Sequence, residues 1–110
     1  MIYKLLLPSE WAALQSNGTS SGAPIDLADG YVHFSTAAQV GETAAKYFAG
    51  IDGLMLLALP SEPLGTALKW ETSRGGDLFP HLYGPLRMAD VAWAKELEQA
   101  DGAHIFPDLT

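Results

Sequence analysis

The residues best suited to chemistry are concentrated in one short stretch, residues 70–85. It holds a Trp, a Glu, an Arg, a His and a Tyr, with three glycines and two prolines. Glycines let a backbone approach a ligand closely, and prolines hold it without conformational freedom. We therefore interpret Arg74–Pro85 as a rigid loop that presents a site. The alternative is a loop that caps the core with Phe79, Leu82 and Tyr83 while its charges face water.

A second group of polar side chains lies on a predicted strand, Tyr31–Ser35. Alternation with period two gives this strand one face towards a cleft and one towards the core, with Tyr31, His33 and Ser35 on the first and Val32 and Phe34 on the second. Thr36 then begins a helix, with Gln39 at the capping-box spacing. A helix N-terminus suits a phosphate or a carboxylate, because its first N–H groups are free. The alternative is a half-buried His beside an ordinary helix cap.

Other catalytic arrangements find little support in the pattern. The sequence has no phosphate-binding G-x-x-x-x-G-K or G-x-G-x-x-G run and no G-x-S-x-G nucleophile elbow. Three histidines, His33, His81 and His104, leave open a zinc-dependent hydrolase, although their spacing matches no H-E-x-x-H motif. We predict no metal site.

Composition narrows the class of protein. The 110 residues contain no cysteine, which excludes disulfides and thiolate chemistry. They carry a net charge of −7. We expect a single domain, residues 1–110, in the cytoplasm, that binds neither membranes nor duplex nucleic acid. The two arginines, Arg74 and Arg87, lie within or beside the first stretch, so a small anionic ligand is still compatible with the charge.

The remaining pattern predicts the elements that must position these side chains. Strands are expected at Ile2–Leu7, Leu54–Leu59 and Ala67–Thr72. Leu86–Glu98 fits a strand or a helix, and we prefer the strand because its apolar residues alternate. Ser9 is a candidate N-cap of one helix, and a second helix runs from Thr36 to about Phe48. Ser16–Gly22 is predicted as a loop or lid, and Asp101-Gly102 as a turn before a last edge strand or packed tail. The fold class is therefore α+β.

The motifs together resemble a known family. The resemblance covers nearly the whole chain and rests on Ile2–Lys4, Trp11, Asp29–Thr36, Gln39, Glu42-Thr43, Trp70-Glu71 and Phe79–Leu86. These residues are similar to the small bacterial family of domain of unknown function 952. The resemblance implies an ADP-ribosyltransferase-like fold, a split mixed or antiparallel sheet with two or three short helices and a cleft that binds NAD in active relatives.

The resemblance also implies roles for individual residues. His33 and Ser35 stand where such enzymes hold NAD, and Tyr83 or Tyr47 would stack on the nicotinamide. Glu71 is the candidate for the carboxylate that stabilises an oxocarbenium-like transition state, with Glu96 and Glu98 as alternatives.

We therefore expect a cleft in which Glu71 and His81 are catalytic. The expected ligand-binding residues are His33, Ser35, Thr36, Arg74 and Tyr83. The predicted function is binding of NAD or a related nucleotide, with NAD as a substrate whose nicotinamide–ribose bond is cleaved. The alternative is a non-catalytic module that binds a small anionic metabolite. The oligomeric state is left open.

Overall fold

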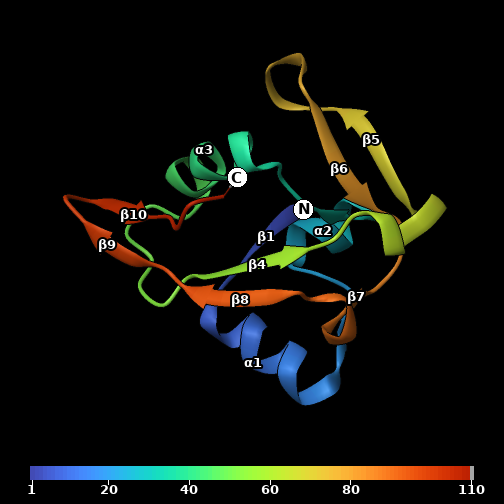
Figure 1. Cartoon of the computed structure of the whole chain (residues 1–110), viewed down its shortest axis with the longest axis horizontal. Coiled ribbons are helices and arrows are strands. Elements are labelled where there is room, and N and C mark those ends of the chain that lie inside the picture. Colours follow the sequence, from blue (N-terminus) through green and yellow to red (C-terminus); the bar gives the residue numbers. More distant parts are fainter. Residues whose placement is uncertain (110) are drawn as a thin grey trace.

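A three-stranded antiparallel sheet forms the centre of the molecule. The computed structural model describes residues 1–109, apart from the side chain of Arg74. The sheet has the order β1 (Ile2–Leu6), β4 (Met55–Leu59) and β8 (Trp93–Glu96). The predicted all-apolar strand at residues 54–59 is confirmed as β4 and lies between the other two strands, as Figure 1 shows.

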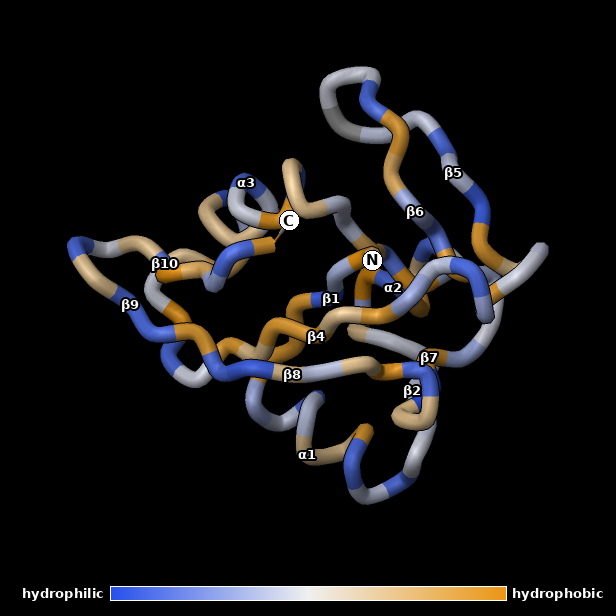
Figure 2. The backbone as a smooth tube through the Cα atoms, in the orientation of Figure 1, coloured by the Kyte–Doolittle hydropathy of each residue, from blue (hydrophilic) through white to orange (hydrophobic). Residues whose placement is uncertain are grey.

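Both faces of this sheet are covered, which explains the continuous apolar run in β4. One face packs with α1 (Pro8–Asn17) in a cluster that includes Leu14 and Leu57. The other packs with α3 (Ala37–Tyr47) in a cluster that includes Val40 and Leu56. In Figure 2 the apolar residues follow β1 and β4 through the middle of the molecule.

A second antiparallel sheet carries the residues singled out from the sequence. Its order is β3 (Val32–His33), β6 (Leu78–Leu82) and β5 (Leu68–Thr72). The β5–β6 hairpin projects away from the central strands in Figure 1. The two sheets meet where Tyr3 and Ser35 exchange backbone hydrogen bonds of 2.8 and 2.9 Å. The segment that follows β3 therefore lies beside β1, and the two sheets are in contact there.

Shorter elements complete the chain. They are α2 (Pro24–Asp29), the pair β2 (Thr19–Ser20) and β7 (Leu86–Arg87), the hairpin β9 (Glu98–Ala100) and β10 (Ala103–Ile105), and 3₁₀ turns at Glu62–Ala67, Arg74–Gly76 and Met88–Asp90. All strand pairs among residues 1–109 are antiparallel. The α+β class is thus confirmed, with antiparallel sheets. No helix in residues 1–109 has both the length and the apolar composition needed to cross a bilayer.

The prediction of a long site-bearing loop at Arg74–Pro85 is wrong in its middle part. Residues 78–82 form β6, the middle strand of its sheet. Pro80 suggested a loop because proline lacks an N–H and is rare inside sheets. Its carbonyl nevertheless accepts a hydrogen bond of 3.0 Å from the N–H of Phe34, so it takes part in the pairing. Ser73–Asp77 turns the chain between β5 and β6, closed by a 2.9 Å bond from Ser73 N to Asp77 O, and Tyr83–Pro85 connect β6 to β7.

Three other expectations are corrected at element boundaries. The first helix begins at Pro8 with Leu7 as its N-cap, not Ser9, because Glu10 Oε1 accepts from the Leu7 N–H at 2.8 Å. The segment 16–22 is only partly a loop, since α1 reaches Asn17 and β2 pairs with β7. The single strand predicted for 86–98 is divided into β7, a 3₁₀ turn, β8 and the start of β9.

We expect the core to depend strongly on β4. Leu57→Ala should lower the free energy of unfolding by about 2–5 kcal/mol, because Leu57 is fully buried and its loss leaves a cavity. Leu78→Ala makes the same change at a side chain that is 53% exposed, and should cost less than about 0.5 kcal/mol. Urea denaturation of both variants gives the comparison. Similar losses in the two variants would contradict this description of the core.

Candidate functional site

A buried carboxylate, Asp26, is the centre of the candidate site. Its side chain is 0% exposed, although Asp is rarely buried without partners. Oδ2 accepts from Lys4 Nζ at 2.9 Å and from the Ala23 N–H at 2.7 Å. Oδ1 accepts from the His33 N–H at 3.0 Å and also contacts His33 Nδ1. Asp26 therefore joins β1, α2 and β3 through a single carboxylate.

The local sequence explains why the chain can place Asp26 there. Pro24 occupies the first turn of α2, where its missing N–H costs nothing, and Asp26 caps that turn through Ala23. Gly22 must be glycine, since an added Cβ would lie 2.4 Å from Asp26 Oδ2 and its φ is +101°. Gly30 ends the helix in the left-handed conformation. The chain then turns directly into β3.

His33 lies between two carboxylates. Nδ1 faces Asp26, and Nε2 is 2.9 Å from Asp29 Oδ2. A doubly protonated imidazole donates to both groups, whereas a neutral ring donates to only one. The His33 side chain is 29% exposed and is not buried among aliphatic groups, so it remains accessible to a ligand.

A second histidine, His81, is paired with Glu71. Nδ1 of His81 donates to Glu71 Oε1 at 2.9 Å, and the Tyr83 hydroxyl donates to the same oxygen at 2.7 Å. These two hydrogen bonds, from Tyr83 first and His81 second, lower the pKa of Glu71. The bond to Glu71 raises the pKa of Tyr83 to about 12. The carboxylate is therefore held ionised and in a fixed orientation while its side chain is still 39% exposed.

The sheet register explains why the two histidines meet. His33 is directly opposite His81, and His81 is directly opposite Lys69, so all three side chains share one sheet face. The ring centroids of His33 and His81 lie 5.4 Å apart. Tyr31 stacks over both imidazoles, at 4.6 Å from His33 and 4.1 Å from His81, and lies 5.2 Å from Tyr83. Burial and then the charges of Asp29, Glu71 and Asp26 raise the pKa of Tyr31.

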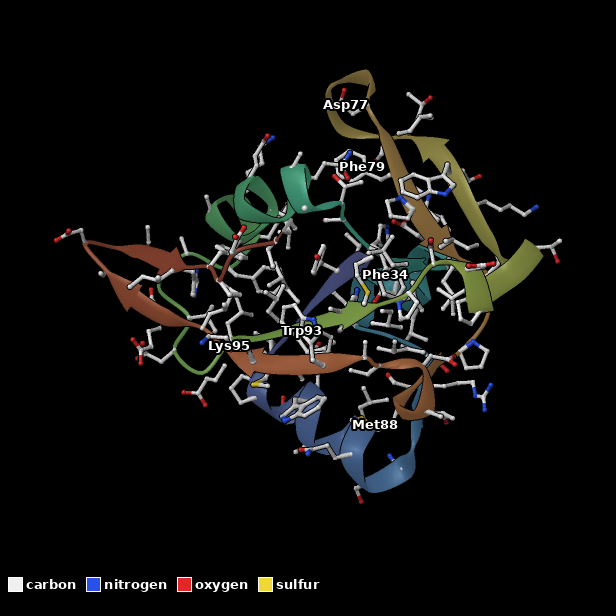
Figure 3. All side chains as sticks on the ribbon, in the orientation of Figure 1. Phe34, Asp77, Phe79, Met88, Trp93 and Lys95 are labelled. Atoms are coloured by element: carbon white, nitrogen blue, oxygen red, sulfur yellow. The ribbon has the colours of Figure 1, made fainter. Side chains whose placement is uncertain are left out.

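A mostly apolar cavity of about 290 Å³ opens beside the histidines. His33 and His81 contribute to its wall, as do Lys4 and Asp26. Aromatic wall comes from Phe34, Tyr47, Phe48 and Phe79. Figure 3 shows Phe34 near the middle of the molecule and Phe79 further out, towards the hairpin turn that carries Asp77. The volume suits one ring or a short chain of a small ligand.

The structure brings together most of the predicted site residues. His33, Ser35 and His81 line the cavity, and Glu71 and Tyr83 are joined to it through His81. Thr36 is not part of this cavity; its N–H is bonded to Gln39 at 3.0 Å, which confirms the predicted cap, and it lines a separate hollow beside α3. The side chain of Arg74, a predicted ligand-binding residue, lies outside the described part of the structure.

The three-histidine zinc alternative is wrong. His104 is on β10 and its Nε2 is 2.8 Å from the Ile51 carbonyl, away from the other two histidines. Within residues 1–109, no group of three or more His, Asp or Glu side chains has the arrangement of a metal site. His81 is also 2% exposed, so its role in packing is larger than a position on a loop would imply.

Sequence reasoning did not identify Asp26 and Lys4. A signal for Asp26 was present, because Pro24, Asp26 and Gly30 have the spacing of a short capped helix. Lys4 had no such signal, because nothing beside it in the otherwise apolar strand indicates that the lysine is buried with the rest of the strand. Only the packing of α2 against β1 reveals that the two residues form a pair.

An α+β chain with this clustered site can be compared with known families. Residues 5–94 match the model of a family described as "Protein of unknown function (DUF952)", and the chain belongs to this family. The resemblance inferred from the motifs is thereby confirmed at the level of the family. Among curated proteins none matches the sequence.

Two solved structures of one protein, CC0527 from Caulobacter crescentus, are similar to this chain. The crystal structure is 50% identical, covers 94% of this chain and 92% of its own, and superimposes with a TM-score of 0.90. The solution NMR structure is also 50% identical, covers 93% and 89%, and has a TM-score of 0.83. The architecture described above is therefore shared with an experimentally determined relative.

We expect Asp26 to matter more for stability than any exposed carboxylate of the site. Asp26→Asn should lower the free energy of unfolding by about 3–5 kcal/mol, because it leaves Lys4 buried without its counter-charge. Asp29→Asn is the matched control: Asp29 also contacts His33 but its side chain is 43% exposed. Its loss should cost less than about 1 kcal/mol. Equal losses, measured in urea, would show that the buried pair is not the main contribution.

Asp26 should also make stability depend on acidity. Burial would raise the pKa of Asp26, but the hydrogen bonds from His33 and the charge of Lys4 outweigh it and hold the pKa below its ordinary 3.8. A carboxyl whose pKa is lower in the folded chain adds stability above its unfolded pKa, and this is lost as pH falls through the folded-state value. The free energy of unfolding is measured as the pH is lowered from about 6, which is about two units above the ordinary pKa of Asp. It should fall more steeply for the native chain than for Asp26→Asn. Parallel curves would contradict this.

Proposed function

We propose that this protein has an ADP-ribosyltransferase-like fold and that its site binds NAD or a related nucleotide, with one ring of the ligand in the cavity, and cleaves the nicotinamide–ribose bond. The observation that carries the proposal is Glu71, an accessible carboxylate held by Tyr83 and His81 beside a group of stacked rings. The motif resemblance that led to the family also makes Glu71 the first candidate for the catalytic carboxylate, ahead of Glu96 and Glu98. NAD enters here as a substrate.

The charge around the site favours a ligand with positive character. Three carboxylates, Asp26, Asp29 and Glu71, surround the two histidines. The nicotinamide ring of oxidised NAD is cationic, and cations are attracted to carboxylates and to the faces of aromatic rings such as those of Tyr31 and Tyr83. The same carboxylates would repel a small anion placed among them, which argues against the alternative of an anion-binding module. The pyrophosphate of NAD must accordingly lie away from these carboxylates.

The chemistry follows from a carboxylate at the point where positive charge develops. When the glycosidic C–N bond breaks, its electron pair leaves with nicotinamide and the ribose becomes an oxocarbenium-like cation. An ionised Glu71 stabilises this cation electrostatically, and the lowered pKa keeps it ionised. Water, or an acceptor nucleophile, then bonds to the ribose carbon and loses a proton.

The orientation of Glu71 is as important as its charge. Tyr83 and His81 both donate to the same oxygen, Oε1, and no side chain in the described part of the chain hydrogen-bonds Oε2, which is therefore left for a ligand hydroxyl. Because the hydrogen bonds are in place before any ligand arrives, little reorganisation is needed at the transition state. The wall of the cavity supplies an aromatic surface for the base or the nicotinamide, with Tyr47 and Phe79 as candidates.

Glu71→Gln tests the catalytic part of this proposal. The variant keeps the size and a hydrogen-bonding oxygen but removes the charge, so nicotinamide release from NAD should fall by about 10²–10³ while NAD binding is retained. Glu96→Gln is the control, since Glu96 is on β8 in the other sheet and should release nicotinamide at the native rate. An unchanged rate in Glu71→Gln would remove Glu71 from the catalytic role.

Binding is tested separately by thermal shift. NAD present at 100 times its Kd should stabilise the fold by about 2.7 kcal/mol. Absence of any shift with NAD, ADP-ribose or nicotinamide at millimolar concentration would contradict the ligand class itself, independently of catalysis.

A further inference from the structure

Lys4 is a buried amine that packing alone does not explain. By strand alternation it lies on the same face of β1 as Ile2 and Leu6, and it pairs across the sheet with Leu57. Ile2, Leu6 and Leu57 belong to one apolar core cluster. Burying a charged amine in such a place costs several kcal/mol before its partner compensates. An apolar side chain would suit the position better.

Asp26 has other donors besides Lys4. Its carboxylate already accepts from the backbone N–H groups of Ala23 and His33 and contacts the His33 ring. Conversely, Asp26 is the one hydrogen-bond acceptor of Lys4 Nζ among residues 1–109, although an ammonium has three donors. The side chain is 7% exposed and belongs to the wall of the 290 Å³ cavity.

The geometry points to Lys4 as a nucleophilic amine that forms an imine with a small, largely apolar aldehyde or ketone bound in this cavity. This activity is separate from the proposed cleavage of NAD. A lysine in an apolar pocket is a suitable nucleophile, because desolvation favours the neutral amine. Burial lowers the pKa of Lys4, and the opposing charge of Asp26 only partly restores it.

A histidine in the cavity wall can accept the proton that Lys4 must lose and return it later in the reaction. When Nδ1 of His81 donates to Glu71, Nε2 is the basic nitrogen, and no residue in the described part of the chain hydrogen-bonds it. The Lys4 ammonium first gives one proton to an imidazole in the cavity wall. Its neutral nitrogen then attacks the carbonyl carbon, forming a C–N bond while the C=O π bond opens onto oxygen.

The step is balanced without any other reactant. One proton passes from the nitrogen to the oxygen, and the imidazole returns the proton that it accepted. The oxygen therefore leaves as water, and the product is a protonated imine between Lys4 and the substrate. The positive charge of this imine replaces that of the ammonium, so Asp26 faces a positive charge on the Lys4 nitrogen both before the reaction and in the product.

The wall of the cavity defines the class of carbonyl compound. Phe34 and Phe79 offer apolar surface, and the 290 Å³ volume limits the ligand to about the size of one aromatic ring with a short side chain. Charged sugars and long acyl chains do not match this wall. A benzaldehyde-like or short aliphatic aldehyde does.

Reductive trapping tests the inference directly. The native chain is incubated with benzaldehyde and sodium cyanoborohydride, which converts an imine irreversibly into a secondary amine. The site is then located by mass spectrometry of peptides, with fragment ions that separate Lys4 from the Met1 amine. Lys4 should be modified faster than Lys46, Lys69 and Lys95, because the cavity holds benzaldehyde beside its amine and burial lowers its pKa, which favours the neutral form.

Two variants complete the test. Lys4→Arg keeps a cation beside Asp26 but cannot form an imine, so the fast adduct should disappear; Lys46→Arg makes the same change at an exposed lysine and should leave it intact. If Lys4→Arg fails to fold, the comparison of lysines within the native chain still decides. Labelling of Lys4 at or below the rate of the exposed lysines would overturn the inference.

Discussion

The buried carboxylate of Asp26 is the constraint on which the local arrangement depends. A charge removed from water must be matched by donors, and here those donors come from three separate segments. Satisfying them fixes how α2 lies against β1 and how β3 leaves α2. Since β3 then pairs with β6, the position of Asp26 also determines where the second sheet and its two histidines lie.

The second sheet turns this constraint into a site. Antiparallel pairing puts His33 opposite His81, and the β5–β6 hairpin brings Glu71 within hydrogen-bonding distance of His81. Each histidine therefore has a carboxylate partner, and Tyr31 covers both rings. The result is a group of polar side chains held by sheet register rather than by a flexible loop, which is the precision that catalysis or selective binding needs.

The cavity beside this group combines two kinds of surface. Its aromatic wall favours an apolar ring, while the carboxylates at its edge favour positive charge, either on a bound ring or developing during a reaction. A nucleotide with a cationic base and an iminium formed on Lys4 both meet that description. The two proposals thus depend on one electrostatic property of the site but involve different reacting atoms, Glu71 in the first and Lys4 Nζ in the second.

Local sequence determined several features without reference to the rest of the chain. The apolar run of β4, the strand at Leu68–Thr72, the cap between Thr36 and Gln39 and the turn at Asp101-Gly102 all follow from short-range pattern and turn chemistry. The family motifs around His33 and His81 also marked the segments that meet, because they gather chemically active residue types where a core would need few of them.

Tertiary structure decided the rest. Pro80 indicated a loop, yet β6 is an inner strand because its carbonyl can pair even though it has no N–H. The pairing of Lys4 with Asp26 spans 22 residues, and nothing local to either residue predicts the other. Spacing and propensity describe neighbours along the chain, whereas a buried charge is made tolerable by partners that only the packed fold brings within reach.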